Sequence, residues 1–179
     1  MTPEESIQEE LELEEDKRVY PPFIVKSLAF IREEIRIEEK TGKSIPYHPT
    51  KITDFIQLIR SIWKISNKAY QKEFWNKHGQ WGDNFGETTL TFEEDAAGIL
   101  DEIDPPIKMT DKQREMLTEL LRIVEEYDGD PNTPLSRYGE NDDAIINDPK
   151  WQKIGEYAKL VYEELSGDNL DEWEAQRKK

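Results

Sequence analysis

The chain has 179 residues, with 24 Lys and Arg against 40 Asp and Glu, which gives a net charge of −16. Bare nucleic acid and anionic membrane surfaces repel such a chain, so we expect neither as a direct partner. There is no cysteine, which excludes disulfides and thiol catalysis, and no apolar run reaches the roughly 18 residues of a membrane-spanning helix.

Apolar residues recur at helical spacing along most of the chain, which predicts an all-α fold. We expect a single-domain, irregular helical bundle over residues 19–179, with about five to seven helices around a central helix near 51–77. At most one short strand or hairpin is expected, near 85–92. Residues 1–18 are expected to form an acidic N-terminal arm.

The charge is divided into blocks. Residues 1–16 hold eight acids and no base, residues 17–86 have a net charge of +6, and residues 87–130 have a net charge of −10. Pro3 and the acids after it favour a helix start, but Ile7 and Leu11 supply little apolar area. Both a frayed arm and a helix lying over the basic part of the chain remain open. No basic, apolar signal segment opens the chain, so a cytoplasmic protein is expected.

Two helices are predicted in the first half of the chain. The first covers about 23–41, with an apolar stripe at Ile24, Leu28, Ile31 and Ile35 and a stop at Gly42. A proline-bounded loop with His48 follows, and this histidine is either inert or a proton-transfer group. The central helix then carries a broad apolar side and, opposite it, a ladder of like charges that predicts acidic groups nearby: Arg60, Lys64, Lys68 and Lys72.

The Gly-rich stretch 79–92 is the least regular part of the sequence. Trp81 and Phe85 alternate with glycines, so they could cap the core or form a partner surface. Thr88 to Phe92 could be a short strand or an extended lead-in. Thr91 has the spacing of a helix N-cap with Glu94, which predicts a helix over 92–103.

The second half predicts helices over 110–129 and 148–167, the latter capped by Asp148 and ended by Gly167, with a last turn or two beyond it. Between them lies a polar loop, 128–143. Its first residues, Asp128, Asp130 and Asn132, match the start of a calcium loop, but later positions do not. An ordinary turn is the simpler interpretation.

No catalytic signature is present, so we expect no enzyme and no cofactor. The one enzymatic alternative is a magnesium-dependent nucleotide pyrophosphohydrolase, because Glu12 with Glu15 and Glu125 with Asp128 have the i,i+3 spacing that aims two carboxylates at one ion. Phosphate and base contacts by the basic ladder with Trp75 are a weaker alternative, since acidic blocks flank it.

The leading hypothesis is a non-enzymatic acidic binding protein. Its most concrete form is an inhibitor, such as an immunity protein or antitoxin, that masks a basic toxin or nuclease by electrostatic complementarity. A DNA mimic of phage or plasmid origin and a helical adaptor are alternatives. The expected partner-binding residues lie in the second acidic block and the polar loop, with two aromatic anchors: Trp81, Phe85, Glu93, Glu94, Asp95, Asp101, Glu102, Asp104, Asp128, Asp130, Glu140, Asp142 and Asp143.

Overall fold

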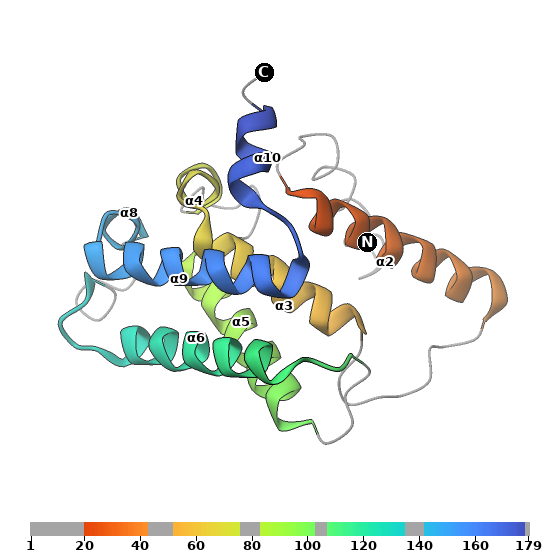
Figure 1. Cartoon of the computed structure of the whole chain (residues 1–179), viewed down its shortest axis with the longest axis horizontal. Coiled ribbons are helices and arrows are strands. Elements are labelled where there is room, and N and C mark those ends of the chain that lie inside the picture. The colour runs from red at the N-terminus through yellow and green to blue at the C-terminus, as the bar shows by residue number, and fades with distance from the viewer. Residues whose placement is uncertain (1–19, 43–51, 76–82, 103–106, 135–141, 178–179) are drawn as a thin grey trace.

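The computed structural model describes residues 20–42, 52–75, 83–102, 107–134 and 142–177 (Figure 1). Within these ranges the chain forms helices and no strand, which confirms the predicted all-α fold. None of the described helices has the length and apolar character needed to cross a membrane. The helices are α2 (Pro22–Thr41), α3 (Ile52–Ser66), α4 (Lys68–Phe74), α5 (Phe85–Asp101), α6 (Asp111–Gly129), α8 (Asp142–Ile146), α9 (Pro149–Ser166) and α10 (Leu170–Arg177).

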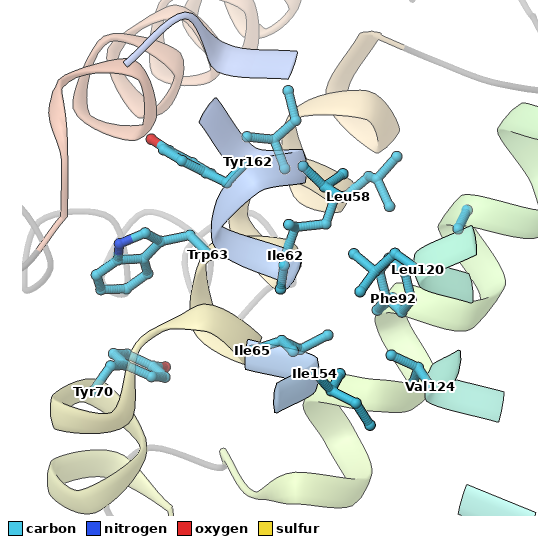
Figure 2. Packing of buried hydrophobic residues seen from close by; sticks show 14 of the residues in the cluster. Leu58, Ile62, Trp63, Ile65, Tyr70, Phe92, Leu120, Val124, Ile154 and Tyr162 are labelled. Carbon is cyan, nitrogen blue, oxygen red and sulfur yellow. The ribbon is translucent and has the colours of Figure 1, made fainter. Parts of the chain in front are cut away.

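Helix α3 forms the centre of the fold. It packs most extensively against α9 and α5, and α6 in turn packs on both of these helices. The predicted apolar side of α3 is buried, and Figure 2 shows three of its residues, Leu58, Ile62 and Ile65, gathered with side chains of the three neighbouring helices. Burying a side chain of this size contributes about 1.5–3 kcal/mol. This contact therefore supplies much of the driving force for folding.

The predicted central helix is broken into two. Helix α3 ends at Ser66 and α4 begins at Lys68, with Asn67 between them in extended conformation. The Asn67 side chain accepts a hydrogen bond from Tyr70 N at 2.8 Å, as a helix N-cap does. In Figure 1 α4 is seen end-on while α3 runs across the view, so the axis turns sharply at this point.

Gln71 explains how the break is tolerated. Its Nε2 donates to the carbonyl oxygens of Lys64 and Ile65, both at 2.8 Å, and its Oε1 accepts from Trp151 Nε1 at 3.2 Å. The side chain is only 2% exposed. Helix α9 comes very close here, because a Cβ atom at Gly155 would lie 3.2 Å from the Ile65 carbonyl oxygen. Gln71 thus joins α3, α4 and α9 through one buried amide.

Helix α5 starts seven residues earlier than the sequence predicts. Its N-cap is Asn84, whose side chain accepts from Glu87 N at 2.8 Å, and not Thr91. The segment from Thr88 to Phe92 is therefore helical, and the optional strand does not form. Threonine is a moderate helix former, and Thr89 bonds its hydroxyl to the Phe85 carbonyl in the preceding turn.

The other predicted helices agree closely with the structure. Thr110 and Gln113 form a capping box at the start of α6, and Asp148 with Pro149 begins α9 as predicted. Gly42 and Gly167 have φ angles of 65° and 80°, the left-handed conformation expected of glycine after a helix. The short α8 was not predicted, since it lies at the end of the expected polar loop.

We expect Gln71→Leu to destabilise the protein by about 3 kcal/mol, because two carbonyls and one indole N–H would lose their partner inside the core. Urea unfolding measures this change. Gln57→Leu is the matched control, since Gln57 is exposed on α3, and it should change the unfolding free energy by less than about 0.5 kcal/mol. Equal effects of the two substitutions would show that the Gln71 amide does not stabilise the break.

Candidate functional site

The outward side of α5 is acidic along its whole length. Glu87, Glu94 and Asp101 recur every seven residues, so they lie on one side of the helix about 10 Å apart. Leu90 and Gly98 lie between them on the same side, and all five residues are exposed. We call these five residues the α5 face. It presents a row of three carboxylates and one apolar side chain, Leu90, which is 51% exposed and lies between Glu87 and Glu94.

The carboxylates of α5 form no ion pair with a basic residue in the part of the chain that the structure describes. The helix contains five acids and no Lys or Arg. Helix α6 differs, because Arg122 pairs there with Glu119 at 2.6 Å and with Glu126 at 2.7 Å. Negative charge is therefore concentrated on α5 and partly neutralised on α6.

Two further acids border the α5 face on either side. Burial, repulsion by Asp128 and Glu125 of α6, and a hydrogen bond with Asp128 raise the pKa of Glu93 to about 7. On the opposite flank, burial followed by repulsion from Asp54 of α3 and from Glu94 raises the pKa of Asp95 to about 7. One oxygen of each carboxyl group is buried without a hydrogen-bond partner. The fold thus holds both groups where ionisation costs free energy.

Asp83 sets which side of α5 faces outward. Its carboxylate accepts hydrogen bonds from Tyr70 Oη and from Thr88 Oγ1, the latter at 2.9 Å, and pairs with Lys64 Nζ at 3.1 Å. Burial acts to raise the pKa of Asp83, but Lys64 and these hydrogen bonds outweigh it and lower the pKa below its usual value. Because Thr88 belongs to the first turn of α5, the network fixes the rotation of that helix against α3 and α4.

Two of the predicted partner-binding residues are structural. Phe85 is 1% exposed and packs edge-on against Trp75 and Trp151, with ring centroids 5.8 and 5.0 Å apart. Asp142 is 4% exposed and accepts a hydrogen bond from Phe85 N at 3.2 Å. An acid at the start of a helix satisfies a free N–H group and complements the helix dipole. These two residues therefore hold α5 and α8 together and do not reach the surface.

The remaining predicted residues fall into three groups. Glu93, Glu94, Asp95 and Asp101 lie on or beside the α5 face, and Glu102 caps its C-terminal end. Asp128 is near Glu93, whereas Asp130 and Asp143 lie in the turn after α6 and in α8. Trp81, Asp104 and Glu140 lie outside the described residues. The structure thus brings the acids of 93–102 and Asp128 together, separately from those of the polar loop.

Leu90 is the surface residue that sequence reasoning missed. The segment containing it was assigned to a strand or an extended lead-in, which hides its position between Glu87 and Glu94. On a helix, residues spaced by three and four positions share a side. Extending the helical pattern backward from Phe92 to Asn84 would have placed Leu90 among the exposed acids.

The basic ladder is split by the helix break. Arg60 donates to Tyr20 Oη at 3.3 Å and lies over the Tyr20 ring, and Lys64 pairs with the partly buried Asp83. The prediction of an acidic group near the ladder is thus confirmed at Lys64. Lys68 and Lys72 belong to α4 and are exposed. The ladder is therefore no continuous surface for phosphate binding.

The residues that the structure describes include no cluster of acids and histidines arranged to hold a metal ion. In the polar loop, the Asp130 side chain accepts from Asn132 N at 2.9 Å and pairs with Lys150 at 3.6 Å, as in an ordinary turn. Glu125 and Asp128 lie in the last turns of α6, but Glu12, Glu15 and His48 lie outside the described residues.

No protein-family model, curated protein or solved structure matches this chain.

The raised pKa values of Glu93 and Asp95 predict that neutral substitutes at these positions stabilise the protein, and that they do so more at high pH than at low pH. A raised pKa means that the folded protein prefers the neutral acid, so the stabilisation present at low pH is lost as the pH rises through about 7. We therefore expect Glu93→Gln and Asp95→Asn each to raise the free energy of unfolding by about 1 kcal/mol at pH 8, since solvent screens these half-buried charges.

The gain should shrink toward pH 5, where the folded wild type is already protonated at these sites. Urea unfolding at several pH values measures it. Asp101→Asn, on the exposed side of the same helix, is the control and should show little pH-dependent gain, because Asp101 contributes to neither raised pKa. A constant gain at all pH values would contradict the electrostatic explanation.

Proposed function

We propose that this protein is a non-enzymatic acidic binding protein that masks a basic protein partner, and that the α5 face is the centre of the contact. A basic toxin or nuclease has the required chemistry. The side chains with which a nuclease binds phosphate are cationic and accessible. Carboxylates presented by an inhibitor occupy such positions and speed the encounter.

The observation that carries the proposal is the concentration of unpaired carboxylates on α5. Five acids on one helix, without an ion pair among the described residues, repel one another. A cationic partner would replace this repulsion with attraction. The excess of acids over bases in the whole chain favours the same kind of partner at longer range.

The exposed Leu90 favours a protein partner over a partner that is bound by charge alone. Interfaces gain most of their affinity from a few desolvated side chains at the centre, with charged groups at the rim. On the α5 face, Glu87 and Glu94 flank the exposed Leu90 in this way. Leu90 thus replaces the buried Phe85 as a proposed apolar anchor, and the prediction for Trp81, outside the described residues, stays a prediction.

The spacing of the carboxylates favours a protein inhibitor over a DNA mimic. Duplex DNA carries about one charge per 1.7 Å of its axis, whereas the outward acids of α5 are about 10 Å apart. Such a sparse row suits a partner that offers a few separate basic side chains.

The sequence leaves two alternatives to this function. One is the magnesium-dependent hydrolase, and the other is a helical adaptor with a neutral partner. Thermal shift assays with Mg²⁺, Mn²⁺ and Ca²⁺ separate the hydrolase from the binding protein. A rise in the melting temperature with one of these ions, beyond that caused by ionic strength, would favour the hydrolase.

We expect reversal of two charges on the α5 face, Glu87→Lys with Glu94→Lys, to abolish partner capture. Both side chains are exposed at α5, so the fold should be retained while attraction becomes repulsion. The measurement is affinity capture at about 0.05 M and 0.5 M salt, where screening differs strongly, with quantitative mass spectrometry of the retained proteins.

The matched control is Glu156→Lys with Glu172→Lys, which makes the same change in net charge on α9 and α10. A basic protein that is captured by the wild type and the control, lost with the α5 variant and weakened by salt supports the proposal. Capture of a neutral protein that is insensitive to salt and to both variants would refute it.

Leu90→Ala tests the apolar anchor with the captured partner. We expect a loss in binding free energy of about 1–3 kcal/mol, as for a central interface residue, with little change in stability. Leu160→Ala, at a residue 55% exposed on α9, is the control and should leave the affinity unchanged. Calorimetric titration measures both, and equal losses would remove Leu90 from the contact.

A further inference from the structure

Helix α4 exposes two lysines in an otherwise acidic protein. Lys68 and Lys72 are four residues apart on one side of α4 and belong to no ion pair among the described residues. Lys68 also borders a shallow groove of about 190 Å³ between α4 and α10, which is lined by Trp173, by Glu174 and by Lys159 paired with Asp171. The side of α4 that carries Lys68 and Lys72, and not this groove, is therefore the surface suited to an acidic peptide.

The described chain begins next to this surface. Tyr20 is 4% exposed, and its ring lies 4.9 Å from Trp63 and 6.1 Å from Tyr70, measured between ring centroids. Tyr70 belongs to α4 and lies between the two lysines in sequence. The described chain is therefore anchored at Tyr20 between α3 and α4, on the side of α4 that carries Tyr70. Trp63 also contacts Trp173 of α10.

The segment that precedes Tyr20 is long enough to reach Lys68 and Lys72, and its charge is opposite to theirs. Lys68 and Lys72 lie on the side of α4 opposite to Tyr70, so the chain has to pass around a helix about 10–12 Å across. Half of that circumference is about 16–19 Å, which five or six extended residues span. Residues 1–14 are therefore within reach, and residues 1–16 hold eight acids and no base.

We propose that residues 1–14 bind in cis to the exposed side of α4, with their carboxylates on Lys68 and Lys72. The contact covers the basic surface of the protein with its own acidic arm. It leaves the α5 face as the charged surface that other proteins meet. A second copy of the chain, whose acidic α5 face could compete for the same lysines, is the alternative occupant that the experiment has to exclude.

The absence of cysteine allows a clean test with the full-length protein. A nitroxide spin label on Ser6→Cys broadens the NMR signals of amides close to it. We expect selective loss of the amide signals of residues 68–74 of α4 at about 0.05 M salt, and recovery of these signals at about 1 M salt, where the screening length falls to about 3 Å. Amides of α6 should keep their intensity.

The charge reversal Lys68→Glu with Lys72→Glu should restore the α4 signals, whereas Lys40→Glu with Lys108→Glu, at exposed lysines elsewhere, should not. A mixture of spin-labelled unenriched protein with unlabelled ¹⁵N protein should show no loss, because the contact is within one chain. Unbroadened α4 signals at low salt, broadening that survives the α4 charge reversal, or equal broadening in the mixture would each overturn the proposal.

Discussion

The backbone carbonyls of Lys64 and Ile65, at the end of α3, need hydrogen-bond donors inside the protein. The donor that they find determines how α4 and the segment before α5 are placed. Gln71 reaches back from α4 to both of them and accepts from Trp151 of α9. The break therefore turns α4 away from α3 at a fixed angle. It also brings Tyr70 and Lys64 to the same carboxylate, Asp83, just before α5. Asp83, held by these two residues, then bonds to Thr88 in the first turn of α5 and fixes that helix against α3 and α4.

The parts of the fold that the sequence predicts are those where local chemistry decides the outcome. Asp148 before Pro149 begins α9, and Gly42 and Gly167 end their helices in left-handed conformation. The break at Asn67 was missed because apolar residues continue at helical spacing on both sides of it. The buried hydrogen bond from Trp151, eighty residues away, helps to hold Gln71 at the break, and such a tertiary contact leaves no signal in the local pattern.

The candidate site was predictable in composition but not in geometry. The acids of 93–102 do gather on one helix, because charge in a helical segment collects on its exposed sides. Phe85 and Asp142 could not be separated from the surface residues by sequence alone. An aromatic residue next to glycine suits a core position and a binding loop equally, and the hydrogen bond between Asp142 and Phe85 N joins segments 57 residues apart.

The flanks of α5 connect stability with the proposed function. A folded protein gains nothing from holding Glu93 and Asp95 in half-buried, like-charged surroundings, and glutamine or asparagine would fill the same space without repulsion. Binding of a cationic side chain reverses the balance, because it stabilises the ionised form of both acids and lowers their pKa values. Part of the free energy lost on folding would then be recovered in the complex. The same acids that weaken the free protein near neutral pH would make its association favour basic partners over neutral ones, which is how electrostatic specificity arises from an unfavourable free state.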